Sequence, residues 1–222
     1  MIGARRFESD AIQGHCKLGR WEEMIRKVIG FFLIWTAMAA VCSAETFDLD
    51  LSAGSTSVTG GVHFKSYLES GYFRVGGSAV YTDDDETEYT LGSLDLTVGS
   101  DTMVPGLTCD VGLRGIYGSV DDNGYSGDVG ALGFTGTAGY LFPSRMIPIP
   151  FEVFGGITWA PGPLAFLDTD NYLEMNAGVG LRIMRNASII LSYTNYHIEM
   201  ESGPGDWTLT DDVFRLGLIM RF

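Results

Sequence analysis

The ten residues at the end of the chain alternate between two kinds of side chain, and this pattern restricts the possible folds more than any other feature. The positions that face one way are all apolar: Phe214, Leu216, Leu218, Met220 and Phe222. The positions between them are Val213, Arg215, Gly217, Ile219 and Arg221, so the opposite face carries two arginines. A period of two is that of a β-strand, and one apolar face opposite one polar face suits a wall between lipid and an aqueous interior. The pattern predicts a membrane-spanning strand.

The N-terminal region has the organisation of a secretory signal. Residues 28–41 form an apolar run that contains one threonine, Arg26 and Lys27 precede it, and the small residues Ser43 and Ala44 follow it. Basic residues, an apolar run and small residues at a cleavage site come in this order in signal peptides. The run is shorter than the roughly 20 residues with which a helix spans a bilayer. A cleaved signal is therefore favoured over an anchor that is never cut.

These signals divide the chain into three parts. We expect a signal peptide over 24–44, cleaved between Ala44 and Glu45, and a barrel domain over 45–222. Residues 1–23 are expected to be an upstream extension without structure, because a second possible start lies at the beginning of the signal. An extended signal that includes these residues is the alternative.

Composition excludes several functional classes. The chain has 28 acidic and 14 basic residues and a formal net charge of −14, so we expect no binding of nucleic acid through its phosphates. Its 30 glycines disfavour a helical protein, because each interior glycine costs about 1 kcal/mol relative to alanine. Curved sheets, in contrast, use glycine to bend. After cleavage Cys109 is the only cysteine, so no intramolecular disulfide can form. No phosphate-binding glycine loop, CxxC pair or HExxH motif occurs, so no cofactor is expected.

Beyond the signal, alternating segments recur between turn residues. They are 46–53, 57–66, 71–82, 88–98, 107–118, 128–142, 149–160, 171–184, 187–200 and 211–222. Most reach the roughly 9–11 residues that a tilted membrane strand needs, but the first is short, so an eight-stranded count stays open. An even count puts both ends of the domain on one side. The expected periplasmic turns are 67–70, 99–106, 143–148 and 185–186, and the expected outer loops are 54–56, 83–87, 119–127, 161–170 and 201–210.

Two all-β architectures compete for this pattern. A soluble β-sandwich also alternates, with its apolar faces turned inward. A barrel is favoured by the signal, by the apolar face on every strand, and by the terminal Phe222, which resembles the end of bacterial outer-membrane barrels. We therefore expect an antiparallel up-and-down transmembrane β-barrel of ten strands in the outer membrane of a Gram-negative envelope. Its expected partners are membrane lipid, lipopolysaccharide, and the barrel-insertion machinery, which would recognise the C-terminal strand.

Short glycine-rich motifs in the C-terminal half resemble those of a known family. They are Gly115-Ile116-Tyr117 with the Asp/Asn/Gly loop after it, Phe154-Gly155-Gly156, Asn176-Ala177-Gly178, Ile183-Met184-Arg185 and Ser192-Tyr193. Over roughly half of the chain, these residues resemble the YfaZ family of outer-membrane proteins. The resemblance implies a porin-like barrel and brings no catalytic residues with it. The connection after Gly156 departs from the family pattern, because Pro161-Gly162-Pro163 expands it.

Charges on the inward faces predict a narrow or blocked lumen. An eight-stranded barrel is about filled by its own side chains, whereas diffusion porins use about 16–18 strands. By their depth along the strands, Arg74, Asp95 and Asp110 should meet, and Glu152 should face Arg182. Asp48, Lys65 and Arg221 should complete the ring. The expected ionic cluster lining the lumen is Arg74, Asp95, Asp110, Arg114, Glu152, Arg182 and Arg215.

We expect these charges to form an ion-paired plug in the periplasmic half. An unpaired buried charge costs several kcal/mol, so buried charges must find partners. Loose pairing in a water-filled pore is the alternative. Distances above about 6 Å between the paired charges would contradict the plug, since neighbouring charges couple strongly only within about 4–6 Å.

Two histidines are the candidate catalytic bases. His197 lies near the outer end of its strand, beside Tyr196, Glu199 and Glu201, but no serine adjoins it; His63 faces inward in mid-strand. These residues form no convincing catalytic arrangement, and we therefore expect that the protein is not an enzyme. The acidic loops Asp83-Asp84-Asp85-Glu86 and Asp121-Asp122-Asn123-Gly124 offer oxygen ligands to divalent cations, although solvated loop tips are the simpler interpretation.

The expected function is that of an integral outer-membrane β-barrel. It would be either a narrow porin-like channel or a structural envelope protein with an ion-paired lumen. The alternatives are a surface hydrolase that acts on lipid or peptide and a loop-mediated adhesion or recognition protein. No catalytic, cofactor-binding or metal-binding residue is assigned.

Overall fold

The computed structural model describes residues 46–84, 87–101, 104–143, 150–201 and 205–222. The expected extension over 1–23, the signal peptide over 24–44 and the cleavage site at Ala44 and Glu45 lie outside these residues. No helix in the described part of the chain is long and apolar enough to cross a membrane.

The described residues form β-strands and one short 3-10 helix. The strands are β1 Thr46–Ala53, β2 Ser57–Leu68, β3 Gly71–Asp83, β4 Thr87–Ser100, β5 Leu107–Asp122, β6 Tyr125–Leu141, β7 Phe151–Ala160, β8 Ala165–Leu167, β9 Thr169–Met184, β10 Ala187–Met200 and β11 Trp207–Arg221. The 3-10 helix η1, Gly162–Leu164, and the three-residue β8 lie in the connection between β7 and β9, and β8 pairs with β6.

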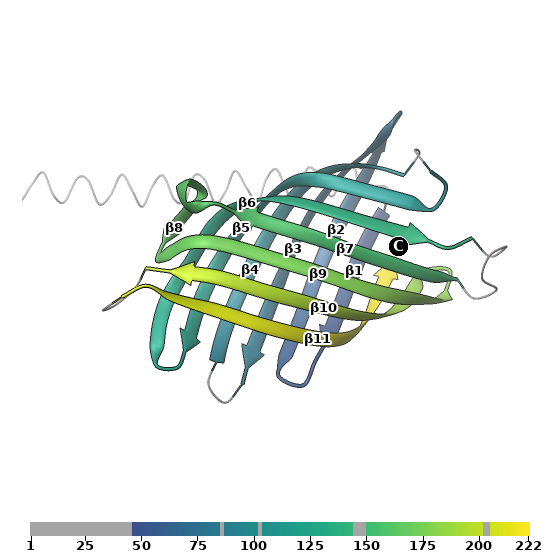
Figure 1. Cartoon of the computed structure of the whole chain (residues 1–222). Coiled ribbons are helices and arrows are strands. Elements are labelled where there is room, and N and C mark those ends of the chain that lie inside the picture. The colour runs from purple at the N-terminus through teal and green to yellow at the C-terminus, as the bar shows by residue number, and fades with distance from the viewer. Residues whose placement is uncertain (1–45, 85–86, 102–103, 144–149, 202–204) are drawn as a thin grey trace, which may run out of the picture. The chain divides into compact units, whose positions relative to one another are not determined.

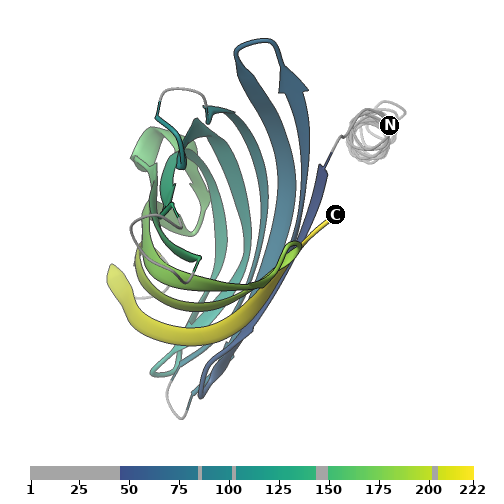
Figure 2. The same cartoon turned by 90° about the vertical axis from the view of Figure 1, so that its right-hand side faces the viewer.

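Ten long strands of the described chain close into an antiparallel barrel (Figure 1). Strands β1 to β7 pair in sequence order, β7 pairs with β9, and β10 and β11 follow. The barrel closes where β1 pairs with β11, with Asp48 opposite Arg221. Backbone hydrogen bonds of 2.9 and 2.7 Å between Phe47 and Phe222 carry this seam to the last residue. Figure 2 shows how the strands curve around one another. The predicted all-β, antiparallel, ten-stranded barrel is confirmed.

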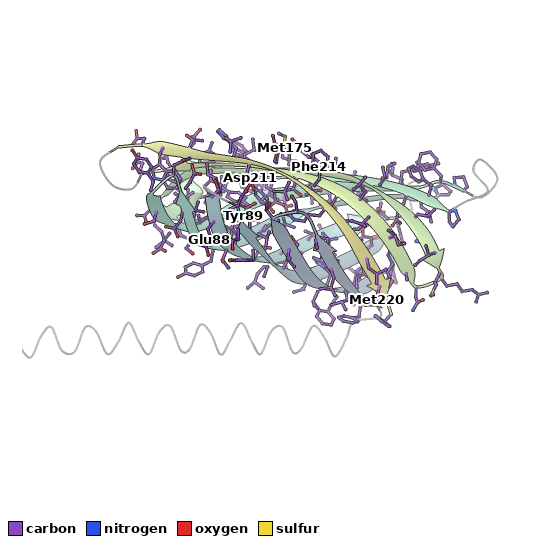
Figure 3. All side chains as sticks on the ribbon, turned by 90° about the horizontal axis from the view of Figure 1, so that it is seen from below. Glu88, Tyr89, Met175, Asp211, Phe214 and Met220 are labelled. Atoms are coloured by element: carbon purple, nitrogen blue, oxygen red, sulfur yellow. The ribbon has the colours of Figure 1, made fainter. Side chains whose placement is uncertain are left out.

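The outer wall of the barrel is apolar. On β11, Phe214 and Leu216 are 65% and 63% exposed, whereas Val213 and Arg215 between them are 5% and 3% exposed. Figure 3 labels Phe214 and Met175 on this wall. Large apolar residues are exposed around the whole circumference: Leu51, Val58, Leu94, Val98, Val111, Tyr117, Phe134, Trp159, Val179, Leu191 and Phe222. A soluble sandwich would bury these side chains, so the structure excludes it and leaves a wall suited to hydrocarbon.

Strands β5 and β6 extend further than the sequence predicted. The expected loop over 119–127 is a two-residue turn, with Asp122 paired with Tyr125 across Asn123 and Gly124. The φ angles of Asn123 and Gly124 are 51° and 83°, the left-handed conformation that a type I′ hairpin turn requires at both positions.

Two other expected loops are also shorter than predicted. Strand β9 begins inside the expected loop 161–170, and β11 begins inside the expected loop 201–210. Beyond the lipid, the outward face need not be apolar. Pairing therefore continues there without the alternation that marks a membrane strand in the sequence.

Candidate functional site in the barrel lumen

The lumen has two halves of different chemistry. We call the end where β1 begins and β11 ends the terminal end, and the opposite end the distal end. The terminal half contains a cavity of about 660 Å³ lined by charged and hydroxyl side chains. The distal half contains a cluster of buried apolar and aromatic side chains.

Ion pairs surround the opening of the cavity at the terminal end. Lys65 Nζ lies 3.6 Å from Asp48 Oδ2 on the neighbouring strand. The Glu152 carboxylate on β7 receives two guanidinium groups, Arg221 at 3.2 Å and Arg182 at 3.9 Å. The expected contact of Glu152 with Arg182 is present. Of the three residues expected to complete the ring, Lys65 and Asp48 contact each other, whereas Arg221 contacts Glu152.

Deeper in the cavity, the expected meeting of Arg74, Asp95 and Asp110 divides into two pairs. Arg74 Nη1 lies 3.5 Å from Asp110 Oδ2, which also accepts a 2.9 Å hydrogen bond from Thr137. Asp95 instead pairs with Arg114, with 3.5 Å between Oδ1 and Nη2. The register explains the difference, because Asp95 and Arg114 stand directly opposite each other on β4 and β5.

Arg114 also reaches across the lumen. Its Nη1 donates to both carboxylate oxygens of Glu174 on β9, at 3.1 and 3.2 Å. The hydroxyl of Tyr172 donates to the same carboxylate at 2.9 Å. Since Asp95 is 2% exposed, Arg114 is the buried cation that balances two carboxylates. Glu174 and Tyr172 were not predicted as members of the cluster. Both lie on the inward face of β9 together with Arg182, and this alternation is the signal that could have found them.

His63 belongs to the same network. Its Nδ1 lies 3.4 Å from Asp50 Oδ2 and its Nε2 lies 3.5 Å from Asp95 Oδ2. His63 and Asp95 are on strands β2 and β4, and the residue paired with both across β3 is Gly76. A Cβ on Gly76 would overlap the His63 ring. The absent side chain lets the two residues touch across an intervening strand.

Arg215 stands apart from the rest of the predicted cluster. It is 3% exposed and donates to Ser57 Oγ at 2.8 Å and Thr194 Oγ1 at 3.3 Å. Its guanidinium carbon lies 5.9 Å from the centre of the Tyr196 ring. Within the described part of the chain, no carboxylate oxygen lies within 4 Å of it.

The distal half of the lumen contains packed side chains. Tyr89 and Tyr196 meet edge to face, with ring centres 5.6 Å apart. The Tyr89 hydroxyl donates to Asp211 on β11 at 2.7 Å, a contact whose residues Figure 3 labels. The largest fully buried apolar and aromatic members are Tyr89, Val120, Val129, Tyr172, Ile198, Met200 and Leu209. The ion pairs of the expected plug lie at 3.1 to 3.9 Å, within the distance expected for them. They line a cavity in the terminal half, and the packed cluster among the described residues is apolar and distal.

The second histidine lies outside the cavity. On the outward face of β10, His197 Nδ1 is 3.1 Å from Thr210 Oγ1, and Nε2 is 3.4 Å from Glu199 Oε1. Neither His197 nor its partners line the lumen. Among the described residues, no group of three or more His, Cys, Asp or Glu side chains could hold a metal ion. Asp85 and Glu86 of the first acidic loop lie outside those residues, and cation binding at these loops stays a prediction.

A family described as "YfaZ precursor" matches residues 27–222. No curated protein matches the sequence. Among solved structures, the NanC porin has 10% identity and a TM-score of 0.38, over 79% of this chain and 98% of that one. The KdgM porin has 10% identity and a TM-score of 0.37, over 80% and 99%. OmpT of Vibrio cholerae has 9% identity and a TM-score of 0.38, over 75% of this chain and 56% of its own length.

The family match extends over the whole described barrel and reaches beyond the C-terminal half in which the motifs were recognised. A closed antiparallel barrel with an apolar outer wall is the architecture of bacterial outer-membrane proteins, and the protein is located in that membrane. The chain belongs to the YfaZ family.

Proposed function

We propose that this outer-membrane barrel is a non-conducting structural envelope protein whose lumen opens only at the terminal end. The observation that carries the proposal is the buried cluster in the distal half. Strands β3 to β7 and β9 to β11 all contribute side chains to it, so it extends across the lumen and does not coat one wall only.

The chemistry of this cluster opposes ion passage. Tyr89, Ile198 and Met200 are 1%, 0% and 1% exposed, and the cluster that they join is mostly aliphatic and aromatic. An ion entering such surroundings must give up its hydration without receiving equivalent ligands, at a cost of tens of kcal/mol by Born solvation. A narrow porin, the other expected function, needs a polar path through this region.

The orientation follows from the even strand count. Both ends of an outer-membrane barrel of this kind face the periplasm, so the terminal half would open to the periplasm. The distal end, with Asp83, Asp121, Asp122 and Glu201 near its rim, would face the outside. The cavity is then a blind vestibule reached from within the cell envelope.

Planar-bilayer recording tests the proposal. Purified wild-type protein is expected to give no steady single-channel steps, and steady steps would overturn the proposal. The double variant Tyr89→Ala and Met200→Ala is expected to produce steps or noisy leakage, because it empties the centre of the cluster. The matched control is Tyr117→Ala, which removes a tyrosine that is 68% exposed on the outer wall and should stay silent.

The C-terminal strand supports a proposed partner, the barrel-insertion machinery. Phe222 and Phe214 are similarly exposed, at 61% and 65%, but only Phe222 is terminal. If the machinery reads the terminal aromatic residue, Phe222→Ala should lower the amount of heat-modifiable barrel in the outer membrane, and Phe214→Ala should not. Equal yields of the two variants would contradict this role.

A further inference from the structure

Arg215 carries a buried positive charge with no carboxylate within 4 Å among the residues that the structure describes. Six cationic side chains line the cavity in the described part of the chain, and five of them lie within 4 Å of a carboxylate: Lys65, Arg74, Arg114, Arg182 and Arg221. Arg215 is the sixth, is 3% exposed, and has hydroxyl groups and an aromatic ring as its neighbours. Buried charges are ordinarily paired, because an unpaired one is left without the solvation that it loses.

The guanidinium group is only partly satisfied by the protein. An arginine has five N–H donors. Nε donates to Ser57 and Nη1 to Thr194, while Nη2 is buried and has no hydrogen-bond partner within the described ranges. The side chain is thus held at Nε and Nη1, while Nη2, which belongs to both bidentate edges of the guanidinium, keeps unused donors. Arg215 is one of the residues that line the cavity. Planar guanidinium groups use such edges to bind carboxylate and phosphate oxygens.

The surroundings of Arg215 suit an oxyanion. Ser52, Thr59, Ser192 and Thr194 line the cavity, and they lie on β1, β2 and β10 near the level of Arg215. Thr59 Oγ1 is also buried, and no described residue gives it a hydrogen bond. Neutral hydroxyl groups donate to anionic oxygens without adding a competing negative charge. Four carboxylates that line the cavity lie within 4 Å of one of the other five cations: Asp48, Asp110, Glu152 and Glu174. A fifth, Asp50, lies 3.4 Å from His63 Nδ1, and Asp101 lines the cavity as well.

We infer that Arg215 anchors a binding site for a small molecule with a carboxylate or phosphate group, located at the inner end of the cavity. The cavity volume of about 660 Å³ falls in the range of small-molecule sites. Entry from the terminal end rests on the closed barrel proposed above, because Leu91, Ile116 and Tyr196 bound the cavity on the distal side. The binding itself does not depend on that closure.

Calorimetric titration of the purified barrel in zwitterionic detergent tests the inference. Inorganic phosphate and acetate are titrated separately at constant ionic strength with chloride as the background anion. Saturable binding of at least one of them is expected, and the two arms identify which oxyanion the site takes. Arg215→Met should weaken that binding at least about tenfold, because it removes charge-assisted hydrogen bonds. The matched control is Arg182→Met, which removes a paired arginine near the opening. Its affinity for the same anion should stay within about twofold of that of wild type.

A measurement of folding separates loss of the site from loss of the barrel. Arg215→Met should keep heat-modifiable gel mobility, and in anion-free buffer its thermal midpoint should be no lower than that of wild type, since an uncompensated buried charge is gone. If it fails to fold, Arg215→Lys keeps the charge without the planar fork and should still weaken binding. The inference is overturned by wild type that binds neither probe, or by equal losses in the Arg215 and Arg182 variants. Steady conductance with intact anion binding would overturn only the proposed function.

Discussion

The two halves of the lumen are held together by different forces, although the same ten strands build both. In the terminal half, charged side chains pair across neighbouring and opposite strands around a cavity, as Arg114 does with Asp95 and Glu174. In the distal half, buried aliphatic and aromatic side chains pack against one another. Ion pairs are stable only in a defined geometry, which limits how closely the surrounding side chains can pack. Apolar side chains have no such directional requirement and can fill the space between strands. The comparison shows why one half of the lumen holds a packed cluster and the other half a cavity.

The largest effect is expected from Arg114→Met in the charged half. Asp95 and Glu174 would lose their shared cation while Asp95 stays buried, and breaking a buried pair in this way costs about 3–5 kcal/mol. Urea unfolding of the barrel in lipid vesicles measures the loss. Adding Asp95→Asn and Glu174→Gln should restore most of the stability. If Arg114→Met alone were neutral, the charged half would not depend on ion pairing.

A slightly smaller effect is expected from Met200→Ala in the apolar half. Met200 is 1% exposed inside the distal cluster, and removing a buried methionine side chain costs about 2–5 kcal/mol through lost contacts and the cavity left behind. The same urea titration compares it with Met175→Ala, since Met175 is 44% exposed on the outer wall. Equal losses in the two variants would show that the distal cluster is not a packed core.

Gly76→Ala should destabilise the barrel by less than the two variants above and by more than a surface substitution. The added Cβ would meet the ring of His63 and the carboxylate of Asp95, and such overpacking typically costs about 1–3 kcal/mol. Gly124→Ala gives a comparison without any neighbour within 4 Å, where only the φ of +83° is unfavourable. A thermal midpoint of Gly76→Ala equal to that of wild type would mean that His63 and Asp95 can separate without cost.

The smallest effect is expected at His197, on the outside of the distal half. Its contacts with Thr210 and Glu199 are exposed, and substitutions at such surface positions usually change stability by less than about 0.5 kcal/mol. His197→Ala should therefore leave the unfolding midpoint unchanged. A hydrolase activity toward lipid or peptide in wild type that disappears in this variant would support the surface-enzyme alternative.

Alternation alone predicted most of the barrel because the membrane imposes it. A strand between hydrocarbon and a lumen must change polarity at every residue, so the two faces of β11 could be assigned from the order of its residues. The pattern weakens where lipid ends, and for this reason a long loop was predicted where the chain makes a tight turn at Asn123 and Gly124. The strands on either side of that turn have no need of an apolar outward face.

Lumen contacts were harder to predict than strands, since they depend on register and shear. Glu152 and Arg182 lie on adjacent strands at similar depth, and their proximity could be inferred from counting residues. The pairing of Asp95 with Arg114, and not with Arg74, depended on which residues stand opposite each other on β4 and β5. The link from Arg114 to Glu174 crosses the lumen, and no count along neighbouring strands reveals it.

The sequence by itself determined that the chain forms a membrane barrel, which of its faces meets lipid, and which charges point inward, because these properties repeat at every second residue. Only the tertiary structure decided that the charges surround a cavity, that apolar side chains pack together in the opposite half, and that Arg215 has no carboxylate within 4 Å in the part of the chain that the structure describes. These outcomes depend on which residues from distant strands reach the same level of the lumen, and that level is set by the stagger of strands in a closed barrel.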